Sequence, residues 1–357
     1  MPRRPWSLPA DAPYPPGWEP FLAAIKAEMF DDTPRLVFAD WLQENGDEDR
    51  AEFIRLQCRR HPLPFDDPAA RELDSRIEAL LKANMARWLS GFPSWFRQEH
   101  AGSFTRGFVT HCAPSGARFL KDGAAITRLT PIDALNLRRV TAGALRAPAL
   151  AEVGGLFLAI VDSARVEALA GHPNLGALRY LFLSNGIRND LSYRQTVHLG
   201  RAAVRALVAN PSLGGLQQFE LNGTKHGDAV TFGIAAGAFA RLEGLALYHS
   251  NLSPDGLKAL VTSAAAPSLS DLCLAGNHFS DAGVRHLVES RALRRLECLN
   301  FVGCGLTAES ARLLADWPGL RTVRWLELSE NGLSEADADL IRGSPHTVAL
   351  TYLGVGR

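Results

Sequence analysis

The chain has 357 residues, of which 46% are hydrophobic, and its 38 acidic side chains balance 38 Lys and Arg side chains. A composition this close to the globular average excludes a disordered or collagen-like chain. A net charge of zero lacks the basic excess of a typical nucleic-acid-binding protein, so we expect no nucleic-acid partner.

Residues 1–18 contain six prolines, too many for a helix or a central strand, and we expect a flexible arm there. This arm lacks the apolar run of a secretory signal. No stretch of the chain approaches the ~18 consecutive apolar residues of a membrane span, so no membrane contact is expected. Five scattered cysteines without a CxxC pair favour a reduced, cytoplasmic setting.

Residues 19–100 carry apolar side chains at helical spacing and are predicted to form a small all-helical domain. Residues that favour turns, at 31–34 and 45–47, separate its helices. The acidic stretch ENGDEDRAE does not match the calcium-loop template. We therefore expect salt bridges at helix ends, either Arg35 with Asp40 or Asp47 with Arg50.

From about residue 101 the sequence repeats with a period of 27 residues, in the pattern L-x-x-L-x-L-x-x-N-x-L. One position of the pattern is occupied by Leu245, Leu272, Leu299 and Leu326. Looser copies lead back to a first strand near Phe108–Val109, and we expect a last strand at Val348–Tyr352. Helix N-cap chemistry, a hydroxyl residue followed within two positions by an acid, has the same period at Ser253, Ser280, Thr307 and Ser334. Each unit is thus predicted to be a strand, a turn and a helix, with a core formed by stacking.

This pattern resembles the leucine-rich repeat family, in the longer class similar to ribonuclease inhibitors. The resemblance covers roughly residues 104–357 and implies that residues 101–357 form an α/β solenoid of about nine units, a horseshoe with parallel strands on the concave face and helices on the convex face. In this family an Asn side chain bonds to the turn backbone, and Asn277 and Asn331 match that position. Cys304 is a familiar replacement for this Asn, and Ser250 is a weaker donor.

The helical segment before the repeats carries a second resemblance. Its motif is RLVFADWL, Arg35–Leu42, followed by Gly46–Asp47 and AEFIRLQ, Ala51–Gln57. These residues are similar to a bacterial repeat-companion domain often found ahead of leucine-rich repeats. The resemblance implies an N-terminal cap over the first repeat and no particular chemistry.

The side chains between the buried strand leucines point to solvent, because strand side chains alternate. The strip mixes aromatic side chains with a few charges, which is typical of a protein-binding surface. The expected binding residues are Phe157, Tyr180, Phe182, Gln218, Glu220, Tyr248, His249, Asp271, Asn300, Trp325 and Glu327. The alternative interpretation is that any solenoid exposes such side chains and that the aromatic ones pack on one another.

Two details of the repeats suggest local exceptions. The interval between Leu181 and Phe219 is longer than one period, so residues near 186–198 are an insertion, either a functional loop or a tolerated one. Cys273 and Cys298 fall on neighbouring strands two positions out of register, which separates their Cα atoms by ~8 Å. This separation is too long for a disulfide, so two free thiols are expected.

The motifs HExxH and GxSxG and a Gly-rich phosphate loop are missing, so we expect no catalytic residue, no cofactor and no metal site. The sequence favours a non-catalytic interaction scaffold, a bacterial cytoplasmic monomer that binds a protein or peptide on the concave face of its repeats. The alternative is a regulator or substrate-presenting subunit of an enzyme, ligase-like or effector-like.

Overall fold

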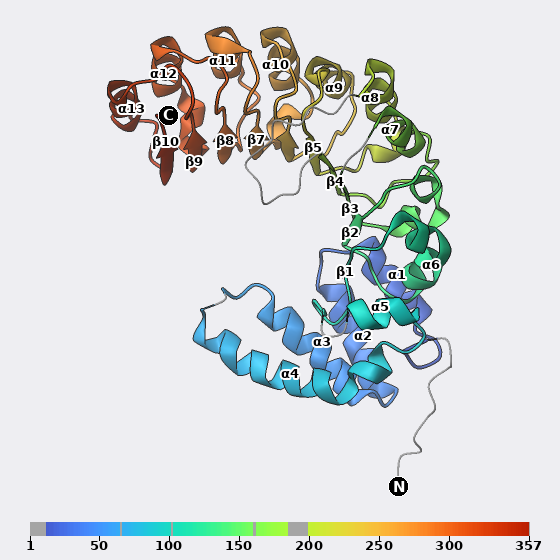
Figure 1. Ribbon diagram of the computed structural model, residues 1–357. Coiled ribbons are helices and arrows are strands. Elements are labelled where there is room, and N and C mark those ends of the chain that lie inside the picture. The colour runs from blue at the N-terminus through green and yellow to red at the C-terminus, as the bar shows by residue number, and fades with distance from the viewer. Residues whose placement is uncertain (1–11, 65, 101–102, 160–161, 185–198, 357) are drawn as a thin grey trace. The chain divides into compact units, whose positions relative to one another are not determined.

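The computed structural model describes residues 12–64, 66–100, 103–159, 162–184 and 199–356 (Figure 1). The chain divides into two compact units: residues 1–136 with 147–155, and residues 137–146 with 156–357. We call them unit 1 and unit 2. The predicted insertion near 186–198 lies outside the described residues, as does the first part of the predicted arm.

Unit 1 contains six α-helices among its described residues, and one short strand pair. The helices are α1 (Glu19–Ala27), α2 (Thr33–Glu44), α3 (Glu48–Arg60), α4 (Pro68–Trp88), α5 (Ser94–Glu99) and α6 (Gly116–Leu129). Strand β1 (His111–Cys112) pairs in parallel with the start of β2 (Ala134–Leu137). The first strand therefore begins after the predicted Phe108–Val109, because Phe108 forms a turn bridge with Thr105 instead.

Part of the proline-rich segment packs into the core of unit 1. Tyr14 and Trp18 are buried, and the Tyr14 hydroxyl donates a 2.9 Å hydrogen bond to the carbonyl of Leu129. The prolines exclude a helix here, but they leave aromatic side chains free to fill the core between them. Residues 12–18 thus contribute buried surface.

The ion pairs of unit 1 differ from the expected ones. Asp40 pairs with Arg55 at 2.5 Å, one helix further along the chain. The guanidinium of Arg35, fully buried, instead donates to the Asp31 carbonyl and lies 4.0 Å from Asp133. Asp47 pairs with Arg87 at 2.8 Å and accepts from the backbone N–H of Arg50. The predicted bridges were wrong, because helical spacing places residues on faces but does not show which tertiary neighbour each face meets.

Unit 2 repeats one strand and one helix, as Figure 1 shows, with the strands on one side and the helices on the other. Its strands are β3 (Gly155–Ala159), β4 (Tyr180–Ser184), β5 (Gln218–Leu221), β6 (Gly244–Ala246), β7 (Asp271–Cys273), β8 (Cys298–Asn300), β9 (Trp325–Glu327) and β10 (Tyr352–Gly354). Its helices are α7 (Ser163–Ala170), α8 (Arg201–Val208), α9 (Gly227–Ala235), α10 (Pro254–Val261), α11 (Ser280–Glu289), α12 (Ala308–Ala315) and α13 (Glu335–Arg342).

The strands form one sheet in chain order, β1 to β10. Leu245, Leu272, Leu299, Leu326 and Leu353 occupy one register row of its parallel strands. The first four leucines of this row are completely or almost completely buried. This register confirms the predicted α/β fold of leucine-rich-repeat type. The last strand is Tyr352–Gly354 and not Val348–Tyr352, because the 27-residue period continues from Leu326 to Leu353.

The asparagine ladder forms as the resemblance implies. The side-chain oxygen of Asn277 accepts from the N–H groups of Ser250 and Leu252, and its amide donates to two carbonyls. Asn331 makes the same bonds one unit later. The Cys304 thiol donates to the carbonyl of Leu274, so it replaces one of the hydrogen bonds that an asparagine amide makes at this position.

Three of the four expected helix caps are present. The side chains of Ser253, Thr307 and Ser334 accept hydrogen bonds from backbone N–H groups of their helices. Ser280 does not cap, because α11 already includes it and the preceding position is Phe279. Among the helices of the described ranges, none combines the length and apolar character of a membrane span.

Candidate functional site

The strands of unit 2 carry two rows of residues, one on each side of the central leucines. Their register defines the first row, Tyr180, Gln218, Gly244, Asp271, Cys298, Trp325 and Tyr352. The second row is Phe182, Glu220, Ala246, Cys273, Asn300, Glu327 and Gly354. We call the surface formed by these two rows the strand face.

The structure brings most of the expected binding residues together on this face. Phe157, on β3, stacks on Phe182 and extends the second row. Tyr248 and His249 lie outside the rows, because they follow β6 in its turn. The His249 ring covers Gly276, where an added Cβ would lie 2.1 Å from Nδ1. His249 and Gly276 have positive φ angles of 47° and 70°, a backbone conformation that glycine tolerates best.

One end of the strand face is apolar and aromatic. The rings of Phe157 and Phe182 stack at a centroid distance of 4.7 Å with an angle of 3° between their planes. Both side chains are half-buried, so each ring is held by its neighbour and keeps part of its surface exposed. Tyr180 lies in the first row of the same strand as Phe182.

The other end combines two aromatic rings with a carboxylate. Trp325 and Tyr352 stack at 5.2 Å with 16° between their planes, and Tyr352 is 43% exposed. The Tyr352 hydroxyl donates to Oε2 of Glu327 at 2.9 Å. Sequence reasoning missed Tyr352, although it follows Trp325 by one period, because the last strand was placed too early.

Glu327 is an ionised and immobilised carboxylate. Its Oε1 accepts hydrogen bonds from the backbone N–H and the hydroxyl of Ser329, at 3.0 and 2.6 Å. Partial burial raises its pKa, but the hydrogen bonds from Ser329 and Tyr352 outweigh this effect and hold the pKa below its usual value. The side chain therefore presents a fixed negative charge beside the Trp325 and Tyr352 rings.

The middle of the strand face is acidic and contains two thiols. Glu220 accepts a 2.6 Å hydrogen bond from the amide of Asn222, and Asp271 accepts one of 2.6 Å from the hydroxyl of Ser270. Register pairs Cys273 with Asn300 and Asp271 with Cys298, so the two cysteines are two positions apart and both are free, as expected.

The thiol of Cys273 is the more acidic of the pair. A hydrogen bond from the Cys298 thiol lowers its pKa, and one from Tyr248 adds to this effect against the opposing effect of burial. The pKa of Cys298 is raised by the same contact. The other three cysteines, Cys58, Cys112 and Cys304, are buried, and burial raises each pKa to about 12.

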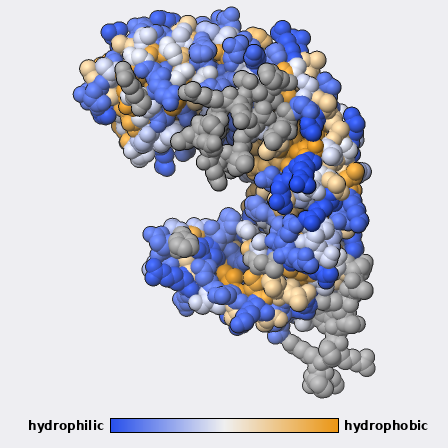
Figure 2. All heavy atoms as spheres, in the orientation of Figure 1, coloured by the Kyte–Doolittle hydropathy of each residue, from blue (hydrophilic) through white to orange (hydrophobic). Residues whose placement is uncertain are grey.

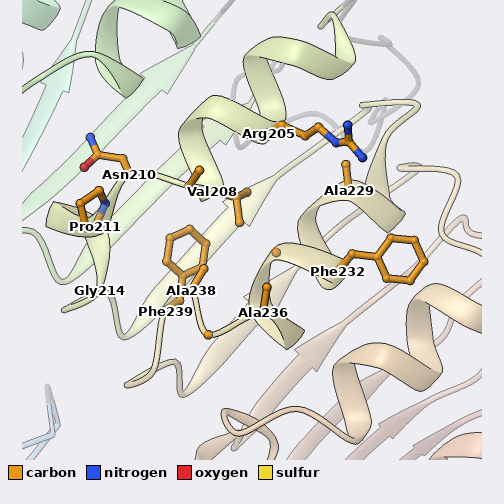
Figure 3. Close-up of a pocket in the computed structure, with 13 residues that line it drawn as sticks. Arg205, Val208, Asn210, Pro211, Gly214, Ala229, Phe232, Ala236, Ala238 and Phe239 are labelled. Carbon is orange, nitrogen blue, oxygen red and sulfur yellow. The ribbon is translucent and has the colours of Figure 1, made fainter.

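A separate hollow of about 620 Å³ lies on the helix side of unit 2, between α8 and α9 (Figure 3). Val208, Phe232 and Phe239 line it with small residues, and Arg205 is its one charged side chain. Such a lining offers no acid–base pair. Among the described residues, no three His, Cys, Asp or Glu side chains are placed to hold a metal ion.

In the view of Figure 2, hydrophilic and weakly hydrophobic residues alternate over the helices at the C-terminal end of unit 2. Single apolar residues spread in this way are ordinary on a protein surface.

Comparisons with known proteins return structures alone. No family model and no curated protein matches the chain. A protein from Bacteroides fragilis is 14% identical over 83% of this chain and 84% of its own, with a TM-score of 0.44. An internalin from Listeria monocytogenes is 16% identical over 65% and 69%, and a yeast Rad7–Elc1 complex structure is 11% identical over 90% of both chains; each has a TM-score of 0.34.

Proposed function

We propose that the protein is a non-catalytic interaction scaffold that binds a protein or peptide on the strand face of unit 2. The observation that carries this proposal is the pair of aromatic stacks, Phe157 with Phe182 and Trp325 with Tyr352, both partly exposed on one sheet. Binding energy at protein interfaces concentrates in a few such aromatic anchors.

The strand face is also suited to binding because it is already ordered. Each ring is held by a stacked partner, and the Glu327 carboxylate is fixed by three hydrogen bonds. A surface whose side chains are fixed before binding loses little conformational entropy when a partner docks. The proposal includes a monomer in the cytoplasm and an N-terminal domain, residues 19–100, that acts as a repeat-companion cap for repeats starting near residue 101.

The alternative function is a regulator or substrate-presenting subunit of an enzyme, ligase-like or effector-like. It uses the same face, but the bound protein would then be modified by an enzyme that the chain recruits. A partner that leaves the complex chemically unchanged favours the scaffold, and a partner recovered with a new modification favours the alternative.

The test is affinity capture from native cell extract with three single variants, followed by mass spectrometry. Phe182→Ala and Trp325→Ala each remove one aromatic stack of the strand face. Phe232→Ala is the matched control, because Phe232 is 46% exposed on the helix side. We expect a partner that is lost with the first two variants and kept with the third. A partner kept by both strand-face variants, shown to be folded by circular dichroism, would overturn the proposal.

A further inference from the structure

The charges of the strand face have one sign. Its two rows contain three carboxylates, Glu220, Asp271 and Glu327, and neither row contains Lys or Arg. Among the described residues, Asp271 and Glu327 take part in no ion pair. Since a charged interface selects a partner of opposite charge, the surface favours a basic occupant.

The end formed by Trp325, Tyr352 and Glu327 has the chemistry that recognises a cation. A guanidinium or ammonium group is attracted to the face of an indole or phenol ring, and the planar guanidinium also bonds to carboxylate oxygens. Oε1 of Glu327 already accepts two hydrogen bonds but Oε2 accepts one, from Tyr352. An ionised carboxylate accepts about four, so Oε2 retains acceptor capacity for a partner's N–H.

The opposite end has the chemistry that recognises an apolar side chain. Phe157 and Phe182 offer ring surface, and the second row of these strands carries no charge there. Phe182 lies on β4 and Trp325 on β9, five strand steps apart in the sheet. At ~4.8 Å per step the two ends are ~24 Å apart, which an extended chain of ~3.4 Å per residue spans with about seven residues.

We propose that the occupant of the strand face is a basic, extended protein segment that runs across the strands. It places an apolar side chain on Phe157 and Phe182 and, about seven residues away, an Arg or Lys side chain on Trp325, Tyr352 and Glu327. A further basic side chain between them faces Asp271. This inference rests on the proposed function of the strand face and specifies the chemistry of the partner.

The experiment selects ligands from an immobilised library of random dodecapeptides with the full chain, then measures Kd for the selected peptides by fluorescence polarisation at two salt concentrations. Glu327→Gln removes the negative charge and keeps the shape of the side chain. Glu309→Gln is the control, because Glu309 is a half-exposed carboxylate on α12 that pairs with Arg285. Phe182→Ala locates bound peptides on the strand face.

We expect selected peptides in which Arg or Lys follows or precedes an apolar residue by about seven positions. Their Kd should rise at least fivefold with Glu327→Gln and with Phe182→Ala, should rise with salt, and should not change with Glu309→Gln. Selection of no peptide, or equal effects of Glu327→Gln and Glu309→Gln, overturns the inference.

Two outcomes separate this inference from the function on which it rests. If Phe182→Ala weakens the binding of peptides that have no preference for basic residues, the proposal of a basic segment is refuted. The proposal that the strand face is a docking surface then stands. Basic peptides that bind equally well to Phe182→Ala, Trp325→Ala and Glu327→Gln lie elsewhere on the protein, and they count against both proposals.

Discussion

Asp281, in the first turn of α11, accepts hydrogen bonds from the backbone N–H and the hydroxyl of Thr307, the N-cap residue of α12, at 2.9 and 2.7 Å. The same carboxylate accepts from the hydroxyl of Ser310. Asp228 bonds in the same way to the N–H of Ser253, the N-cap residue of α10, at 2.8 Å. An acidic side chain of one unit thus binds the first turn of the helix in the next unit. These bonds connect neighbouring helices, just as the asparagine bonds connect neighbouring turns.

Asp281→Ala should lower the free energy of unfolding by about 1–2 kcal/mol, because it removes the partners of a helix cap. Urea denaturation at neutral pH measures the change. Asp255→Ala is the control, since this exposed acid of α10 has no comparable contact, and it should change stability by less than about 0.5 kcal/mol. Equal losses in the two variants would contradict the role given to Asp281.

The contribution of Asp281 should depend on pH. Partial burial raises its pKa, but the hydrogen bonds from Ser310 and Thr307 outweigh it, so the pKa in the folded protein lies below the usual value. Because the folded-state pKa is lowered, the stabilisation is present at neutral pH and is lost as the pH falls through that pKa. The stability difference between wild type and Asp281→Asn should therefore shrink in acid; a constant difference would refute this.

Asn277→Ala should be more damaging, at about 2–4 kcal/mol, because it leaves buried N–H and carbonyl groups without partners. Ser250→Ala removes hydroxyl bonds to the carbonyls of Leu221 and Tyr248 and should cost about 1 kcal/mol. Chemical denaturation of both variants gives the order. A smaller loss for Asn277→Ala than for Ser250→Ala would argue against the asparagine ladder as the main tie between turns.

Substitutions of Arg50, on α3, test how the core of unit 1 is stabilised. Its buried guanidinium lies 4.7 Å from the Trp88 ring and 5.2 Å from the Phe104 ring, and donates to the carbonyl of Gly107 at 2.7 Å. Arg50→Ala should lower the free energy of unfolding by about 3 kcal/mol or more. It leaves a cavity among these aromatic rings and leaves the Gly107 carbonyl without its hydrogen-bond donor. Arg50→Met fills the space without a charge, so its loss of stability, measured by thermal denaturation, should be smaller. Equal losses would mean that the cation, and not packing, is what the enclosure needs.

Cys273 should be the most reactive thiol of the native protein. Its lowered pKa gives more thiolate near neutral pH, while Cys58, Cys112 and Cys304 have a pKa of about 12 and are buried. Timed alkylation with iodoacetamide and peptide mass spectrometry measures each rate. Cys298→Ala removes the donated hydrogen bond and should slow the labelling of Cys273. Labelling of Cys298 before Cys273 would contradict the assignment.

Much of the repeat fold was predictable because it depends on period alone. The interval between Leu245 and Leu272 determines strand, turn and register together, and the half-buried side chains on either side of the leucines follow from alternation. Local exceptions were not predictable in this way. Ser280 has the residue type of a cap, but it is the first residue of α11, with a backbone φ of 52°, and Phe279 occupies the N-cap position.

The sequence also does not predict which residues tertiary packing brings into contact. Nothing in the spacing of residues indicates that Arg35 meets Asp133 or that Arg106 bonds to the Met29 and Phe30 carbonyls. The same holds for the candidate site. Alternation predicts that Trp325 and Glu327 share a face. Tyr352, whose ring stacks on Trp325 and whose hydroxyl donates to Glu327, lies on a strand that was predicted to end at this residue and instead begins there.

The uniform register of β5 to β10 gives the strand face a constant spacing between neighbouring row positions. From β6 to β10, each 27-residue unit adds one position to each row and about 4.8 Å of length. Evolution or engineering could therefore lengthen or shorten the span between the phenylalanine end and the tryptophan end in fixed increments, by gaining or losing whole units. A partner segment would have to change by about one and a half residues for every unit.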